Sequence, residues 1–341
     1  MKQLTEYYCE ESNKIMKNEE KKIGNDCVYL CLEQYFQEIN SAFPLYSAFI
    51  IGGGLDIEVG GVENSFIGCK KKLCDIYIDG LNKLGIKVIK KVFPVSENVN
   101  VLKKELQQGK YVILQLASKE IEYHSIFAEN RNVGHFVNIT RIRGSEIFIR
   151  DNYIPTREIS TFEGWYSIEK CNTAWQKCGC ICFILEKQNL PEFNNIICEY
   201  NKKYFGSVIK QYCEKLEDIK KFFLLEIQGL TKISKVEINK KIYNLIYDIK
   251  LFGFLFSKKY LHAYMTKFDI MDFFWLDEYS KVVKEWNGLI LLILKLEFFI
   301  NEEKIASLNN KIEKIIQYEI LVLQHRSFLY NSNIRNSKKG G

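Results

Sequence analysis

Apolar residues follow two different patterns along the chain, and the change falls near residue 190. The first half mixes helical and strand-like spacing. Apolar side chains recur at helical intervals over Cys27–Ile39 and over Cys74–Leu84, which Gly85 closes, and a short helix is predicted at Val101–Gln108, stopped by Gly109. Strand-length runs rich in Val, Ile and Phe occupy Ile86–Phe93, Tyr111–Leu116, His135–Ile142, Glu146–Arg150 and Cys180–Leu185. Helices first and an antiparallel sheet after them predict an α+β domain over residues 1–189.

Past Pro191 the spacing is helical almost throughout. The clearest interruptions are Asn287–Gly288 and Asn301, and the second opens an amphipathic helix toward Gln324. We therefore expect an all-α C-terminal domain over residues 190–330, followed by a flexible polar tail at 331–341.

Composition and charge favour a soluble protein. Hydrophobic residues make up 47% and charged residues 26%, which is the balance of a globular chain. Met1–Glu20 lacks the apolar run of a secretory signal, and Gly288–Ile300 is too short to cross a bilayer. The net charge of +6 is spread without a compact Arg/Lys stripe. We expect a cytoplasmic protein that binds neither nucleic acid nor membrane.

The eleven cysteines are scattered, which in this setting favours free thiols over a disulfide framework. Cys178, Cys180 and Cys182 alternate along an apolar stretch, so they could share one strand face and hold a metal. Filling the core as small hydrophobes is the more common role of such residues. We predict no metal site and no cofactor.

Cys27 is the cysteine whose local sequence points to chemistry. Gly24, Asn25 and Asp26 are turn and cap residues, so Cys27 is predicted in the first turn of the helix that follows. Unpaired N–H groups at a helix start stabilise a thiolate and can also donate to an oxyanion. Taken alone, a cysteine in this position is more often structural. Cys31, one turn further, is interpreted as a packing residue.

A predicted hairpin supplies the partners that Cys27 would need. If its turn is centred on Arg143, His135 faces Asp151, and the pairs Val137/Ile149 and Ile139/Ile147 share the same sheet face. A carboxylate there would fix the tautomer of the imidazole and stabilise its charged form. The alternative is a surface histidine at a strand start. His124, in a loop-like stretch, is a weaker candidate base.

These residues resemble the papain-like families that include the C39 bacteriocin-processing peptidases. The resemblance covers roughly residues 20–185 and rests on Asp26-Cys27, on Cys31-Leu32, on His135-Phe136-Val137 and on Asp151, in the family's order. It is closer to the N-terminal domain of the butirosin-type acyltransferase family, through the Gly-rich segment 49–55 and the spacing from Gly109 through Tyr123 to His135. The resemblance implies a papain-like fold with Cys27, His135 and Asp151 as a catalytic triad. The composition and the separate helical half are also similar to the cysteine-protease-like, amide-forming enzymes of closthioamide assembly.

One position departs from the peptidase pattern. The peptidases place Gln six residues before the cysteine to complete the oxyanion hole, and this chain has Lys21 there. The candidate donors are Lys21, Asn25 and the backbone N–H of Cys27. Each oxyanion donor is worth about 2.7–4 kcal/mol, so a weakened hole is best tolerated by an activated substrate such as a thioester.

The resemblance therefore implies an acyltransferase that forms an amide. Its donor would be an acyl or peptidyl carrier protein, and its acceptor a small amine such as a diamine, in natural-product biosynthesis. The alternatives are a C39-like peptidase that cleaves a leader peptide and a non-catalytic binding protein. The helical half would shape the acceptor pocket or form a homodimer contact. Gly52–Gly54 lacks the Lys-Ser/Thr of a phosphate loop, so we expect a backbone approach to the active site or a turn.

Overall fold

The computed structural model describes residues 26–60, 66–94, 98–129, 132–155, 160–186, 190–298 and 300–337. It has an α+β architecture with antiparallel sheets and many helices, in agreement with the α+β part of the predicted fold class. The chain divides into two compact units, and they do not follow a single cut. Phe49–Ile76 belongs with the chain from Asn194 onward, whereas residues 26–48 belong with Tyr77–Phe193. The boundary predicted at residue 189 does not include this exchange of segments between the units, and it stays a prediction.

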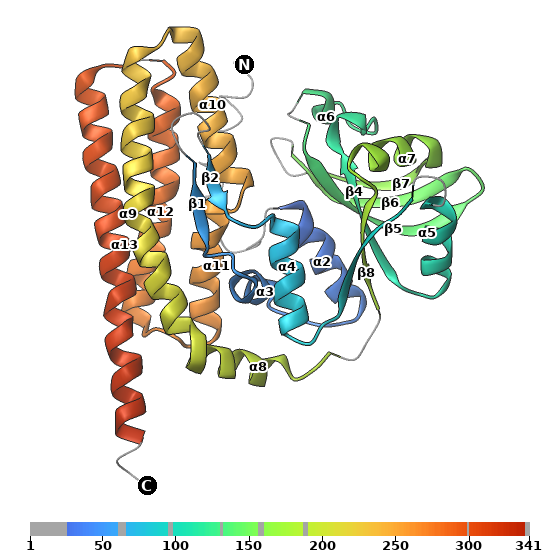
Figure 1. Ribbon diagram of the computed structural model, residues 1–341, viewed down its shortest axis with the longest axis horizontal. Coiled ribbons are helices and arrows are strands. Elements are labelled where there is room, and N and C mark those ends of the chain that lie inside the picture. Colours follow the sequence, from blue (N-terminus) through green and yellow to red (C-terminus); the bar gives the residue numbers. More distant parts are fainter. Residues whose placement is uncertain are drawn as a thin grey trace. The chain divides into compact units, whose positions relative to one another are not determined.

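The unit that contains Tyr77–Phe193 is built on a six-stranded antiparallel sheet in the order β3-β8-β4-β5-β6-β7 (Figure 1). These strands are β3 (Val88–Val92), β4 (Tyr111–Ala117), β5 (Gly134–Arg143), β6 (Glu146–Ile154), β7 (Ser160–Ser167) and β8 (Ile181–Leu185). One face buries an apolar cluster that includes Val137 and Ile149 beneath Trp175. Trp175 comes from α7 (Ile168–Lys177), which packs on β4, β6 and β7. Helix α5 (Asn98–Gln107) packs on β4 and β5.

Helix α2 (Cys27–Glu38) packs against β5 and β6 of this sheet. Its first turn is fixed by Asp26, whose Oδ1 accepts the Tyr29 N–H at 2.8 Å, as an N-cap aspartate should. The other Asp26 oxygen accepts the Tyr77 hydroxyl at 2.9 Å. The unit also contains α6 (Ile126–Glu129), whereas α3 (Leu45–Gly52) and α4 (Leu73–Lys83) each run across a boundary between the units, after Ala48 and after Ile76.

The second unit is mainly helical. It contains the short strands β1 (Ile57–Val59) and β2 (Ile67–Cys69) and the helices α8 (Phe193–Tyr200), α9 (Gly206–Gly229), α10 (Lys235–Leu251), α11 (Phe254–Lys267), α12 (Phe273–Lys295) and α13 (Glu302–Ser337). Helix α13 packs along α9 and α12 (Figure 1). Their core holds a fully buried ion pair, Lys258 with Glu319 at 2.9 Å. Glu319 also accepts hydrogen bonds from Tyr212, Tyr279 and Trp286.

Several predicted elements differ from the observed ones. Helix α12 runs through Asn287–Gly288 without a break, because Trp286 and Leu289 are buried on either side and packing outweighs local propensity. Asn301 does open α13, its side chain accepting the Lys304 N–H at 2.8 Å. That helix continues to Ser337, past the point where a flexible tail was expected. Strand β7 and helices α3 and α7 were not predicted.

The register of the β5–β6 hairpin was also predicted wrongly. Ile139 lies opposite Ile149, and Ile142 lies opposite Ile147, so the turn is not centred on Arg143. The turn is the two-residue segment Gly144–Ser145, and Gly144 has φ 56°, as the first central residue of a type II′ turn requires. A β-bulge lies at Thr140 in β5, before the turn, between Ile139 and Arg141.

The bulge decides which side chains share a face. Near the turn Arg141 pairs with Phe148, so an odd-numbered residue of β5 shares its face with even-numbered residues of β6. Beyond the extra residue Ile139 pairs with Ile149, so odd then matches odd. His135 and Asp151 therefore lie on one face as diagonal neighbours. In an unbroken two-residue hairpin they would lie on opposite faces.

Candidate active site

Cys27 occupies the first position of helix α2, as the sequence predicts. The N-cap Asp26 serves the N–H of Tyr29, so the N–H groups of Cys27 and Val28 have no acceptor inside the helix. The Cys27 side chain is partly exposed, unlike that of Cys31. The Cys27 side chain therefore has solvent access and lies at the positive end of a helix, which is where reactive cysteines are commonly found.

His135 and Asp151 are in direct contact. His135 Nε2 lies 2.8 Å from Asp151 Oδ2. His135 is 4% exposed and Asp151 is 0% exposed, so their interaction is shielded from water. Cys27 lies close enough to the His135 side chain to contribute to raising its pKa. Because Nε2 faces Asp151, Nδ1 is the ring nitrogen left to face the thiol.

The imidazole is held in its charged form. Burial by itself would lower the pKa of His135, but the charge and the hydrogen bond of Asp151, with a smaller contribution from Cys27, raise the pKa to about 10. An imidazolium beside a cysteine is the usual way in which a thiol is prepared to act as a nucleophile.

Asp151 is held by two further donors. Its Oδ1 accepts the Tyr153 N–H at 3.0 Å, and its Oδ2 accepts the Tyr123 hydroxyl at 2.7 Å. A buried carboxylate without such donors would be strongly destabilised. Tyr123 was not predicted as a site residue. It lies in a loop 28 residues before Asp151, and no local pattern relates the two positions.

Cys31 is a packing residue, as expected. Its Sγ donates to the Phe136 carbonyl at 3.4 Å, and its side chain is buried. Burial, with smaller contributions from Cys27 and Asp151, raises the pKa of Cys31 well above its ordinary range. This thiol is therefore unreactive. The contact joins α2 to β5 one residue after His135, which helps to fix the helix against the strand that carries the candidate base.

Of the three oxyanion-hole candidates, the structure describes the backbone N–H of Cys27. The backbone N–H of Cys27 is at the helix start and is oriented outward along the helix axis, as oxyanion binding requires. Lys21 and Asn25 lie outside the described residues, so their role stays a prediction.

The other candidate residues take structural positions. His124 Nδ1 accepts the Ile126 N–H at 3.2 Å and so serves the start of α6. Cys180 and Cys182 belong to the apolar cluster of the sheet, but only Cys182 lies in β8. Gly53 has φ 103°, and a side chain on Gly54 would overlap the Phe49 ring, so the Gly-rich segment forms a tight turn after α3.

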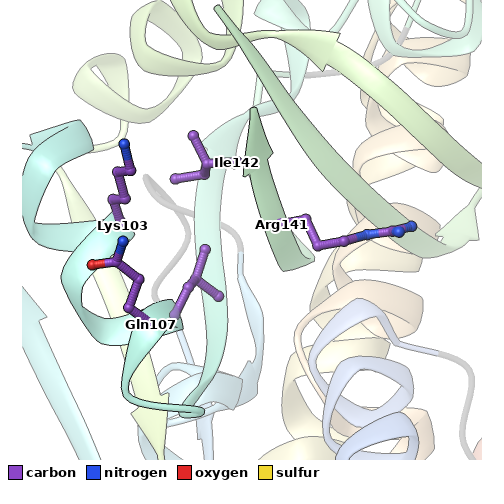
Figure 2. A pocket seen from close by; sticks show the side chains of 5 residues that line it. Lys103, Gln107, Arg141 and Ile142 are labelled. Carbon is purple, nitrogen blue, oxygen red and sulfur yellow. The ribbon is translucent and has the colours of Figure 1, made fainter. Parts of the chain in front are cut away.

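A hollow of about 180 Å³ lies elsewhere on this unit, between α5 and β5. It is lined by Lys103, Leu106, Gln107, Arg141 and Ile142. Figure 2 shows the Arg141 side chain extending away from Lys103 and Gln107, so the polar groups do not converge on one point. Cys27, His135 and Asp151 are not part of it, and the hollow is no candidate for the reaction centre.

Across the described ranges, no three His, Cys, Asp or Glu side chains gather in a way that could hold a metal ion. No helix within these ranges combines the length and apolar character needed to cross a bilayer.

Comparisons with known proteins add little to the evidence from this geometry. No protein-family model matches the sequence, and no curated protein is significantly similar to it. A solved structure that is similar is a protein from Bacillus anthracis described as a C39-like peptidase, with 14% identity over 37% of this chain, 62% of that chain and a TM-score of 0.26. The match therefore spans less than two thirds of that protein. A TM-score of this size does not establish a common fold, and the site is interpreted on its own geometry.

Proposed function

We propose that this chain is a cysteine-dependent acyltransferase with a papain-like catalytic unit, which passes a carrier-bound acyl or peptidyl group through Cys27 to a small amine. The observation that carries the proposal is the contact of His135 with the buried Asp151, with Cys27 near enough to help raise the pKa of the same imidazole. This is the arrangement of a nucleophile, a base and a group that orients the base.

In the first half of the reaction, the Cys27 thiolate attacks the carbonyl carbon of the donor thioester. The resulting oxyanion lies near the N–H groups at the start of α2. Collapse of this intermediate breaks the C–S bond to the carrier, and the departing thiolate takes a proton from the His135 imidazolium. The acyl group is now attached to Cys27 as a thioester.

In the second half, the amine attacks the acyl-enzyme. The neutral His135 imidazole takes the proton that the amine nitrogen loses, and Cys27 leaves as a thiolate beside the imidazolium. An amide is released, and the starting ion pair is restored. Water in place of the amine would give hydrolysis, which is the chemistry of the alternative, a peptidase that cleaves a leader peptide.

The choice of acyl transfer over peptide cleavage rests on Lys21, which stands where the resembling peptidases have the oxyanion Gln. A thioester carbonyl is activated, so its attack needs less help from the hole than attack on a peptide bond. A carrier protein as donor and a diamine as acceptor follow from the resemblance.

The test uses an N-acetylcysteamine thioester of 4-hydroxybenzoyl-β-alanine as donor and a short α,ω-diamine as acceptor, with intact-mass detection. We expect one acyl group on the wild-type protein, none on Cys27→Ala, and an unchanged adduct on Cys198→Ala, which removes an exposed thiol of α8. Equal labelling of Cys27→Ala would exclude Cys27 as the nucleophile. Adding the diamine should release the acyl group as an amide. Release only as free acid would favour the hydrolase.

A further inference from the structure

The Oδ2 atom of Asp151 serves two donors at once. His135 Nε2 lies 2.8 Å from it, and the Tyr123 hydroxyl donates to it at 2.7 Å. The remaining oxygen, Oδ1, accepts the Tyr153 N–H. Among the described residues with an observed hydrogen bond to Asp151, Tyr123 is therefore the one side chain that binds the same oxygen atom as the candidate base, His135.

The Tyr123 ring is fixed by aromatic contacts on several sides. It stacks on Phe162 with ring centroids 4.3 Å apart and an interplanar angle of 9°. Phe127 and Tyr166 meet it edge-on, and Phe127 also contacts the His135 ring at 4.9 Å. The hydroxyl cannot leave Asp151 without breaking this stacking, so its position is set by the packing of β7 and α6.

Tyr123 remains a donor over the whole working pH range. Burial, followed by the charge and the hydrogen bond of Asp151, raises the pKa of Tyr123 well above its ordinary range. The other titratable groups acting on it are Cys171 of α7 and Tyr166 of β7. Burial raises the pKa of both and brings that of Cys171 to about 12, so both are neutral. Cys27 is the remaining titratable group that faces His135.

We propose that Tyr123 is a positioning residue whose hydroxyl holds the Asp151 carboxylate with Oδ2 toward His135 and withdraws part of the carboxylate's charge from the imidazolium. The inference rests on the proposed function only in taking His135 and Cys27 as the reacting pair. A donor on the shared oxygen competes with Nε2 for the same electron density. The strength of that donor therefore sets how tightly the imidazolium holds its proton.

The test measures alkylation of Cys27 by iodoacetamide from about pH 5 to about pH 11, with the site identified by peptide mass. The rate should rise first as the thiolate–imidazolium pair forms and again as the imidazolium loses its proton. Tyr123→Phe removes the donor and should move the second step to higher pH, by ~0.5–1 unit. Replacing Tyr123 with 3-fluorotyrosine strengthens the donor and should move the same step to lower pH.

Tyr166→Phe is the matched control. Its hydroxyl lies in the same aromatic cluster but accepts the Glu122 N–H at 3.3 Å and has no contact with Asp151. We expect the wild-type pH profile from this variant. Opposite shifts for the two changes at Tyr123, with none for Tyr166→Phe, support the proposal. Equal profiles for Tyr123→Phe and wild type, or the same shift for Tyr166→Phe, overturn it.

The fluorinated protein keeps the assay decisive if Tyr123→Phe does not fold, because an unshifted or upward-shifted second step there also overturns the proposal. Failure of the proposed function gives a different result. In that case His135→Ala leaves the alkylation profile of Cys27 unchanged, and the reacting pair itself is wrong. If the profile depends on His135 but not on Tyr123, the result contradicts only the positioning role of Tyr123.

Discussion

Replacing Asp151 with Asn separates the charge of this residue from its shape. The amide has one acceptor, whereas Asp151 accepts from Tyr153 through Oδ1 and from Tyr123 and His135 through Oδ2. With the amide oxygen toward Tyr153, the NH₂ group donates to His135 Nε2 and to the Tyr123 oxygen. With the opposite orientation, the NH₂ group meets the Tyr153 N–H, which leaves two buried donors facing each other.

The first orientation is therefore favoured, and it forces His135 into the wrong tautomer. Nε2 must then accept, so the proton moves to Nδ1, which faces Cys27 and can no longer take the thiol proton. An analogous change in serine proteases lowers kcat by ~10⁴. We expect a loss of the same order in Cys27 acylation, which corresponds to about 5 kcal/mol in the activation free energy.

The fold should survive this change. The Tyr123 hydroxyl hydrogen loses its acceptor, at a cost of about 1–3 kcal/mol, against a typical stability of about 5–15 kcal/mol. The assay is single-turnover acylation by the thioester probe, followed by intact mass, together with thermal unfolding. Glu163→Gln is the control, since this exposed carboxylate of β7 pairs with Arg150 outside the site. A folded Asp151→Asn protein that acylates within tenfold of wild type would refute the tautomer argument.

Three further predictions concern stability and geometry. The pKa of His135 is raised from 6.5 to about 10, so its protonated form stabilises the fold fully below about pH 6.5, and this contribution is lost as the pH rises through about 10. Urea unfolding across this range should show the decline in wild type and a smaller one in His135→Gln, and equal slopes would contradict the assignment. Lys258→Met leaves Glu319 buried without its cation and should lower the unfolding free energy by about 3–5 kcal/mol, with partial recovery in Lys258→Met/Glu319→Gln. A loss below about 1 kcal/mol in urea unfolding would show that the three other donors to Glu319 suffice. Deleting Thr140 removes the bulge but should leave acylation of Cys27 by the thioester probe within about tenfold of wild type, because Ile139–Ile149 and Arg141–Phe148 then become consecutive pairs and His135 and Asp151 keep their common face. Loss of acylation in a folded variant would mean that the bulge itself positions the pair.

The parts of the site that could be predicted from sequence are those with local causes. Asp26 caps the helix that begins at Cys27 because a short carboxylate can reach the N–H three residues on. The strands that carry His135 and Asp151 can be recognised from their Val, Ile and Phe content. The helical spacing after Pro191 likewise corresponds to α8–α13.

The parts that could not be predicted depend on residues distant in the sequence. The hairpin turn was placed one or two residues too early, and the bulge at Thr140 has no local signature. The two departures offset each other, so His135 and Asp151 share a face in both the predicted and the observed register. Tyr123 reaches Asp151 only because Phe162 and Phe127 pack around its ring. Side-chain packing in three dimensions determines such contacts, and no period along the chain reports it.

Sequence by itself thus indicated the mixed α and β character of the first half, the helical spacing of the second half and the three residues that we propose for thiol chemistry. Tertiary structure alone decided the sheet order, the assignment of Phe49–Ile76 to the helical unit and the second donor on Asp151. The physical reason is that caps and hydrophobic periods act over a few residues. Register, bulges and buried hydrogen bonds are instead selected by how well distant segments exclude water and satisfy one another's polar groups.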